Sequence, residues 1–330
     1  MNKIIVTLIL LLSIFSKAMA NDEKLIVYTY DSFASEWGPG PSVEKSFEKL
    51  CKCDLEFIGM DSSIGILGRL KLEGKKSEAD IILGLDTNLL AAARDTNLLS
   101  DHGADLSKIN IPVKWDDEMF LPFDWGHFAF VYDRMKLASP PQSFEELIKS
   151  DNNLRIIIQD PRTSTPGLGL LLWVKSIYGE KANIIWEKLS PKIVTVTKGW
   201  SEAYGLFLEG EADMVLSYTT SPAYHILVEK DDKFASANFK EGHYLQIEVA
   251  AITANTKNPE LAKKFMKFIL QDEFQNIIPT TNWMFPVTDV QVPDIFNKIN
   301  QPETTFLYPS IEVEKNRAEW VSEWRKALIK

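Results

Sequence analysis

The first third of the chain alternates short apolar runs with amphipathic segments. Apolar runs that end in polar residues predict three strands, at 25–30, 54–59 and 80–86. The intervening segments space their apolar residues as helices do, which predicts helices at 42–50, 63–79 and 88–99. Ser42 is the expected N-cap of the first helix. Strands and helices that alternate with short links are typical of a parallel α/β sheet.

A second block of the chain repeats this alternation. The same pattern predicts strands at 155–161, 193–199 and 213–220, with helices at 167–179 and 201–212. The segment SEADIILGLD at 77–86 resembles GEADMVLSYT at 210–219, which suits two related lobes, although a chance match is the alternative. In open α/β sheets, ligands bind beyond the carboxyl ends of strands. We therefore expect a shared rim of polar strand ends, which includes Asp31, Asp61, Asp86, Asp160, Lys198 and Thr219.

Two more amphipathic helices are expected near the C-terminus, at 259–270 and 312–330. The first carries Leu261, Phe265, Phe268 and Ile269 on its apolar face. In the second, the apolar residues recur at four-residue steps, which predicts a buried stripe of Trp320, Trp324 and Leu328.

The first twenty residues have the pattern of a secretory signal peptide. Lys3 provides the positive end, an apolar stretch follows, and Ala18, Met19 and Ala20 form a cleavage site, so we expect cleavage after Ala20. A retained membrane anchor is the alternative. Cleavage removes Lys3 and Lys17 and changes the net charge from −10 to −12. This acidic balance argues against nucleic acid as a partner. The sequence thus predicts a protein of the periplasm.

The length and the few cysteines further limit the interpretation. About 310 residues after cleavage exceed one typical hydrophobic core, so two lobes are expected. Cys51 and Cys53 are the two cysteines, and an oxidising compartment favours a local disulfide over free thiols. The four histidines have no metal-ligand spacing, and none of the common catalytic motifs occurs. We expect neither a metal site nor catalytic residues.

Clustered hydroxyl groups indicate a site for an anion. Ser164 and Thr165 stand where the helix of the segment QDPRTSTPGLGLLLW begins, and a helix N-terminus offers free N–H groups. A second cluster follows the strand at 213–220 and consists of Tyr218, Thr219, Thr220 and Ser221. Helix capping explains the first cluster alone. Both clusters together favour donors to one phosphate.

Aromatic residues in loops and at strand ends provide flat faces for a ring. These residues are Tyr30, Trp37, Trp200, Tyr224 and Trp283. Stacked faces of this kind stabilise a cationic ring by about 0.5–2 kcal/mol each. Asp31, Asp61 and Asp160 offer carboxylates that balance a positive charge or accept from an amino group. The pattern therefore predicts a flat cationic heterocycle with a phosphate or hydroxyl tail.

Long strings of the sequence resemble the periplasmic thiamine-binding proteins of thiamine ABC transporters. Examples are EWGPGPSVEKSFE, QDPRTSTPGLGLLLW, KGWSEAYGLFLEGEADMVLSYTTSPAYHILVEK and NWMFPV. The resemblance implies a two-lobed type II periplasmic binding fold, with a mixed, mostly parallel sheet flanked by helices in each lobe. It implies a monomer that binds thiamine, thiamine monophosphate and thiamine diphosphate as transported ligands, with no cofactor. The partners implied are a membrane permease and its cytoplasmic ATPase.

The resemblance also implies site residues and lobe boundaries. Ser164 and Thr165 match the phosphate side, and the residues expected around the rings or in the cradle are Tyr30, Trp200, Tyr218, Thr219, Thr220, Ser221, Tyr224 and Trp283. In a further ligand loop the family can carry Asp-Gly, whereas this chain reads Asp61, Ser62 and Ser63. We expect one lobe at 21–125 plus about 250–300, the other at about 126–249, and a helical segment at 301–330 that packs on both.

Two other functions remain open at this stage. A ferric-ion-binding protein of the same fold would use clustered tyrosinates, and Tyr218 and Tyr224 offer two phenols, but no histidine or carboxylate partner is evident. A secreted thiamine-modifying enzyme would need a nucleophile beside a base. Cys51 and Cys53 stand in an early loop without such a base.

Overall fold

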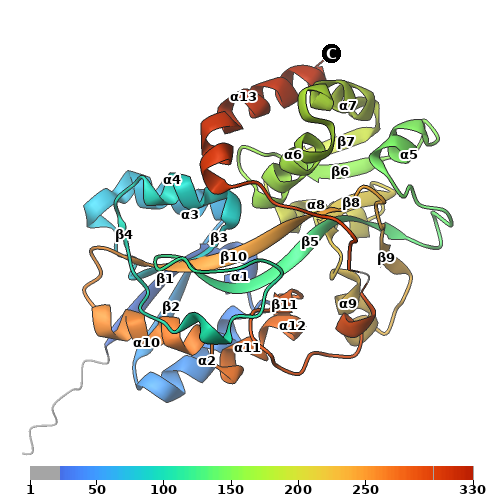
Figure 1. Cartoon of the computed structure of the whole chain (residues 1–330). Coiled ribbons are helices and arrows are strands. Elements are labelled where there is room, and N and C mark those ends of the chain that lie inside the picture. Colours follow the sequence, from blue (N-terminus) through green and yellow to red (C-terminus); the bar gives the residue numbers. More distant parts are fainter. Residues whose placement is uncertain (1–22, 300, 330) are drawn as a thin grey trace, which may run out of the picture.

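The computed structural model describes residues 23–299 and 301–329 (Figure 1). The predicted signal peptide at 1–20 and its cleavage site lie outside the described residues. The strands are β1 Lys24–Tyr30, β2 Asp54–Met60, β3 Ile81–Asp86, β4 Leu99–Ser100, β5 Leu121–Asp133, β6 Ile156–Gln159, β7 Ile193–Thr197, β8 Met214–Tyr218, β9 Phe234–Ser236, β10 His243–Thr253, β11 Phe285–Pro286 and β12 Thr305–Phe306.

The helices are α1 Asp31–Ala34, α2 Gly40–Cys51, α3 Ser63–Glu73, α4 Leu90–Arg94, α5 Phe144–Lys149, α6 Thr165–Tyr178, α7 Ala182–Leu189, α8 Trp200–Leu208, α9 Pro222–Tyr224, α10 Pro259–Ile269, α11 Asp272–Gln275, α12 Ile278–Thr281 and α13 Ser310–Ile329. The helices that the apolar pattern predicts are present in the predicted order, but α3 and α4 end earlier than predicted, and the pattern did not predict α1, α5, α7, α9, α11 and α12. Short 3₁₀ or π turns are η1 Gly74–Lys76, η2 Thr87–Leu89, η3 Leu106–Lys108, η4 Gly179–Lys181, η5 Ser190–Lys192, η6 His225–Glu229 and η7 Phe296–Lys298. Among the described residues, none of the helices combines the length and apolar character needed to cross a membrane.

The sheet joins two groups of parallel strands through a central antiparallel pair. Its order is β2-β1-β3-β10-β5-β8-β6-β7. Strand β1 pairs in parallel with β2 and β3, and β6 pairs in parallel with β7 and β8. In contrast, β10 is antiparallel to β3 and β5, and β5 is antiparallel to β8. The predicted mixed, mostly parallel α/β fold is therefore confirmed.

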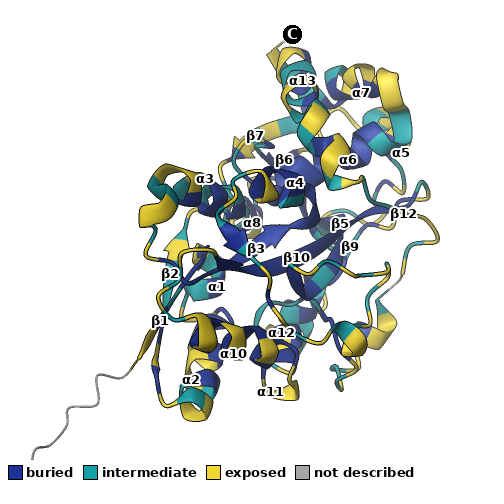
Figure 2. Cartoon of the chain, turned by 60° about the vertical axis from the view of Figure 1, so that its left-hand side comes forward, coloured by how far each residue is buried: buried dark blue, intermediate teal, exposed yellow. Residues whose placement is uncertain are grey.

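The central strands β5 and β10 connect the two strand groups (Figure 1). The first part of β5, 121–127, pairs with β10, whereas Phe128 to Tyr132 pair with β8. Both strands are buried along almost their whole length (Figure 2). Strands covered on both faces are usually continuous apolar runs. Here they also bury Asp124, Gln246 and Glu248, which places polar groups at the centre of the molecule.

The C-terminal helices bury the apolar faces that their spacing predicts. In α10, Leu261, Phe265, Phe268 and Ile269 are all buried. In α13, Trp320 and Trp324 are buried and Leu328 is partly buried, so the predicted core stripe is confirmed. Helix α13 packs on α4 and on the consecutive helices α6 and α7, two regions that lie far apart in the sequence (Figure 1).

Helix α2 begins earlier than predicted. It starts at Gly40 with Pro39 as its N-cap, so the prediction of Ser42 as the N-cap is wrong. Pro41 occupies the first turn, where its missing N–H and fixed φ angle cost nothing. The proline therefore extends the helix by two residues at its N-terminus.

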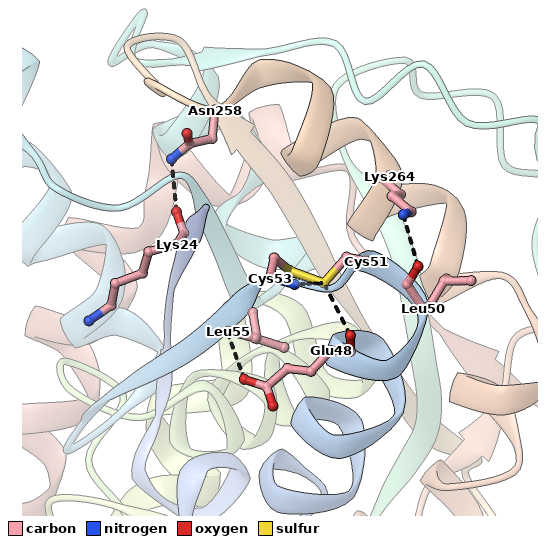
Figure 3. Close-up of a disulfide and its surroundings, with 8 residues drawn as sticks. All are labelled: Lys24, Glu48, Leu50, Cys51, Cys53, Leu55, Asn258 and Lys264. Carbon is pink, nitrogen blue, oxygen red and sulfur yellow. Dashed lines mark hydrogen bonds between the residues drawn. A yellow bond between two sulfur atoms is a disulfide. The ribbon is translucent and has the colours of Figure 1, made fainter. Parts of the chain in front are cut away.

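A disulfide joins Cys51 and Cys53 at the C-terminal end of α2 (Figure 3). The two Cα atoms are 5.2 Å apart, which is within the usual range for a disulfide. Lys52 between them adopts a left-handed conformation, and its N–H donates to the Glu48 carbonyl oxygen at 2.8 Å. The local disulfide favoured by the sequence is confirmed, and it closes the turn between α2 and β2.

Candidate functional site

The carboxyl ends of both parallel strand groups face one cavity of about 600 Å³. Each group contributes loops that follow its strands, as expected for a ligand site in an open α/β sheet. Thirteen of the residues predicted from the sequence line this cavity: Tyr30, Asp31, Trp37, Asp61, Ser62, Ser63, Ser164, Thr165, Trp200, Tyr218, Ser221, Tyr224 and Trp283. Residues that are more than 250 positions apart in the chain thus share one cavity.

Thr219 and Thr220 do not line the cavity, in contrast to the prediction. The backbone N–H of Thr219 donates to the His127 carbonyl oxygen at 2.9 Å, and its buried hydroxyl has no hydrogen-bond partner within the described chain. The Thr220 hydroxyl lies 4.0 Å from the Met284 sulfur. The chain turns sharply after β8, so these two side chains point into the protein while Tyr218 and Ser221 reach the cavity. Of the four hydroxyl donors predicted after β8, only Tyr218 and Ser221 therefore line the cavity.

Two helix N-termini meet at one end of the cavity. Ser62 caps α3 by accepting from the Gly65 N–H at 3.2 Å, and Ser164 caps α6 by accepting from the Gly167 N–H at 3.5 Å. The Thr165 hydroxyl donates to the Ser63 hydroxyl at 3.5 Å, which joins the two helix ends across the gap. Helix N-termini carry partial positive charge and free N–H groups, so this end of the cavity suits an anion.

Aromatic side chains form the walls. Tyr224 and Trp283 meet edge to face, with ring centroids 5.4 Å apart. Trp200 stacks on Tyr204 at 5.0 Å, and its indole N–H donates to the Ser217 hydroxyl at 2.8 Å. These contacts hold the ring planes in fixed orientations. Trp37 also lines the cavity and is 58% exposed, so its ring stands at the mouth.

The floor of the cavity is acidic. Glu248 of β10 lines it, and the Tyr30 hydroxyl donates to the Glu248 Oε2 atom at 2.8 Å. Asn282 lies beside them and donates through its Nδ2 atom to the Asp124 carboxylate at 2.5 Å. Burial, followed by the neighbouring Asp124 carboxyl, raises the pKa of Glu248 well above its usual range. Burial also raises the pKa of Asp124 to about 7.

The lining has an excess of negative groups. Among the described residues that line it, Asp31, Asp61 and Glu248 carry carboxyl groups, and none is a lysine or an arginine. At the rim, Asp61 forms an ion pair with Lys198, which follows β7 in the other strand group. Asp160 does not reach the cavity, because it forms an ion pair with Arg162 at 2.6 Å. The sequence-based expectation for Asp160 is corrected accordingly.

Comparison with known proteins identifies the family. The model of the bacterial extracellular solute-binding proteins matches residues 31–276. The thiamine-binding periplasmic protein of Escherichia coli (strain K12) is 58% identical over 304 residues, which cover 92% of this chain and 93% of that protein. A solved structure of a periplasmic thiamin binding protein superimposes with a TM-score of 0.91 at 57% identity, covering 92% of this chain and 96% of the other.

The chain belongs to the thiamine-binding periplasmic proteins, within the bacterial extracellular solute-binding protein family. This is a family of binding proteins and not of enzymes. An apo ferric ion-binding protein A from Pasteurella haemolytica shares the fold, with a TM-score of 0.77 at 16% identity over 92% of this chain and 98% of the other. The family assignment and the fold class drawn from the sequence are both confirmed.

No observation favours the ferric alternative in this thiamine-binding family member. The described residues contain no group of three or more histidine, cysteine, aspartate or glutamate side chains that could hold a metal ion. The Tyr218 hydroxyl accepts from the Gln246 Nε2 atom at 3.1 Å, and burial, followed by Glu248, raises the pKa of Tyr218.

Among the residues that line this cavity, sequence reasoning did not single out Glu248 and Asn282, which form its floor. Glu248 stands in the run HYLQIEVAAIT, which forms β10, a strand that the alternation of apolar and polar segments did not predict. A useful signal was available, because a lone carboxyl in a strand buried on both faces needs a partner or a ligand. Asn282 precedes Trp283 in a loop, and no pattern singles it out.

Proposed function

We propose that this protein is the periplasmic thiamine-binding component of an ABC transporter and that it captures thiamine, thiamine monophosphate and thiamine diphosphate. One observation carries the proposal: a single cavity combines aromatic walls, an acidic floor and two converging helix N-termini. Thiamine joins a flat cationic ring system to a hydroxyl or phosphate tail. The ligand and the cavity therefore match at both ends.

Each part of the cavity has a role in this proposal. Tyr224, Trp283 and Trp200 flank the rings, and the acidic floor balances their positive charge. The phosphate accepts from the N–H groups and hydroxyls at the starts of α3 and α6. These donors are neutral groups and not lysine or arginine side chains. When thiamine binds with its hydroxyl tail instead of a phosphate, no buried positive charge is therefore left without a partner. A site built in this way accepts all three forms.

The lobes close over the ligand by a hinge motion in which the crossing strands bend. We infer lobes at 21–125 plus about 250–300 and at about 126–249, which β5 and β10 connect. Two contacts link the loops of the two lobes, the Asp61–Lys198 ion pair at the rim and the Thr165–Ser63 hydrogen bond at the anion end of the cavity. A membrane permease recognises the closed monomer, and its cytoplasmic ATPase drives uptake. Cleavage after Ala20 releases the protein into the periplasm.

Titration calorimetry tests the function directly. We expect thiamine and thiamine diphosphate to bind with dissociation constants below about 10 μM, which corresponds to roughly −7 kcal/mol. A mass spectrum of protein purified without added ligand should show a carried-over vitamin. Failure of both ligands to bind at this level would refute the proposal.

Replacing Ser164 with alanine should weaken the two phosphorylated forms more than thiamine. The change removes a hydroxyl at the start of α6, and a hydrogen bond to a charged group contributes about 1.5–3 kcal/mol, so the phosphorylated forms should lose roughly tenfold or more. Calorimetry with the three ligands measures the difference. Ser143→Ala is a matched control, because Ser143 caps α5 in the same way and lies outside the cavity. Equal losses for the three forms would contradict the phosphate assignment.

A further inference from the structure

Neither the anion-binding end of the cavity nor its aromatic walls account for the acidic side chain of Glu248 on the cavity floor. It lies on the central strand β10, is 5% exposed, and what remains exposed faces the cavity. The Tyr30 hydroxyl donates to its Oε2 atom, and Asn282 in turn donates through Nδ2 to the Tyr30 oxygen at 3.0 Å. These contacts hold the carboxyl group against the floor, so it meets any ligand that fills the cavity.

The surroundings of Glu248 disfavour a negative charge in the empty protein. Asp124 stands opposite it on the neighbouring strand β5 with no exposed surface, and the two carboxyl groups lie within hydrogen-bonding reach of each other. An uncompensated carboxylate in such a place is costly. Burial beside a second carboxyl group therefore favours the protonated, neutral form of Glu248 in the empty protein.

We propose that Glu248 selects the positive charge of the ligand: it is a neutral acid in the empty site and becomes a carboxylate when a cationic heterocycle binds. The inference rests on the proposed function. The O–H bond of Glu248 breaks, both bonding electrons stay on the carboxylate oxygen, and the proton passes to solvent. One positive charge thus leaves the site as another enters, and the ligand itself is unchanged.

The groups that face Glu248 support this exchange from every neighbouring strand. They are Tyr30 on β1, Asp86 on β3, Asp124 on β5 and Tyr218 on β8, with neutral Asn282 after α12. All four titratable neighbours are acids. Burial and then Asp124 raise the pKa of Glu248, and a cation nearby lowers it again.

The exchange predicts how affinity changes with pH. Glu248 has a lower pKa in the complex than in the empty protein. At pH values between these two pKa values, the complex binds fewer protons than the empty protein. Affinity for the cation therefore rises as pH rises through this interval and is constant on either side of it. An uncharged ligand would leave Glu248 protonated, so its affinity would not rise in this way.

Calorimetry in buffers of different ionisation enthalpy tests the inference at about pH 7. For the wild-type protein and thiamine, the apparent binding enthalpy should change with the buffer in the direction of proton release, up to about one proton. Glu248→Gln keeps the shape of the side chain but does not ionise, so the release from Glu248 should vanish. Any proton that thiamine itself gains or loses contributes equally to the binding enthalpies of the wild-type protein and the variant. Tyr30→Phe keeps the carboxyl group and should keep the release.

A second measurement compares thiamine with an analogue whose thiazolium is replaced by an uncharged ring. The wild-type protein should prefer thiamine by roughly 10- to 100-fold, as expected for one charged contact, and Glu248→Gln should lose most of this preference. If wild-type protein binds thiamine tightly but releases no proton and does not prefer the charged ring, the inference is wrong while the proposed function stands. If thiamine does not bind at all, the proposed function itself fails. The measurements on the wild-type protein, proton release and preference for the charged ring, test the inference even if a variant folds poorly.

Discussion

Trp283→Ala is expected to weaken binding of thiamine, thiamine monophosphate and thiamine diphosphate alike, by about 30-fold or more. Trp283 follows α12, lines the cavity and meets the Tyr224 ring edge to face. Removal of a tryptophan that anchors a ligand commonly costs about 2 kcal/mol or more. Because Trp283 belongs to the wall and not to the anion end, the loss should not depend on the tail.

The backbone at Trp283 strengthens this expectation. Its φ angle is 57°, in the left-handed region that side chains rarely adopt, and its N–H donates to the Ile278 carbonyl oxygen at 3.0 Å. Conformations of this kind persist where the surroundings hold them, and they cluster at ligand sites. The strain keeps the indole directed into the cavity.

Calorimetry of each variant with the three ligands measures the Trp283 effect, and thermal unfolding checks the fold. Trp283→Phe should restore much of the affinity, since a flat ring remains. Trp115→Ala is a control for the loss of a tryptophan outside the cavity, because the Trp115 indole N–H donates to the Phe120 carbonyl oxygen instead. Its affinities should equal those of the wild type. A loss at Trp283 confined to the phosphorylated forms would refute its placement beside the rings.

Gly167→Ala is expected to lower the free energy of unfolding by about 2–3 kcal/mol, the scale of overpacking in a tight core. Gly167 stands in the first turn of α6 and packs against the end of β6. A Cβ atom there would overlap the Gln159 carbonyl oxygen and lie 2.7 Å from the Asp160 carbonyl carbon. Backbone atoms of a buried strand cannot move aside as a flexible side chain does. The first turn of α6 must therefore shift, and it carries Ser164 and Thr165.

The matched control for Gly167 is Gly205→Ala in the middle of α8. No atom lies within 4 Å of a Cβ at Gly205, so the substitution adds helix propensity without a clash. It should stabilise the protein by about 0.5–1 kcal/mol. Chemical denaturation of the ligand-free variants measures both effects. Equal stability of the two alanine variants would contradict the close packing of α6 on β6.

Local features of the fold follow from the sequence because they depend on neighbours in the chain. The strands β1, β2 and β3 and the apolar faces of α10 and α13 follow from the spacing of apolar residues. The disulfide follows from two nearby cysteines in a chain whose sequence predicts secretion. Thirteen residues of the cavity follow as well, because most of them are polar or aromatic residues that come after a strand and so stand at its carboxyl end.

Only the tertiary structure decided which strand ends share a cavity and which charges enter it. The antiparallel pairing of β5 with β10 brings Glu248 and Asp124 together, and no local pattern reports a contact over such a sequence separation. The sharp turn after β8 removes Thr219 and Thr220, and an ion pair with Arg162 removes Asp160. The direction of a side chain depends on backbone angles and on partners from distant segments, which the order of residues alone does not specify.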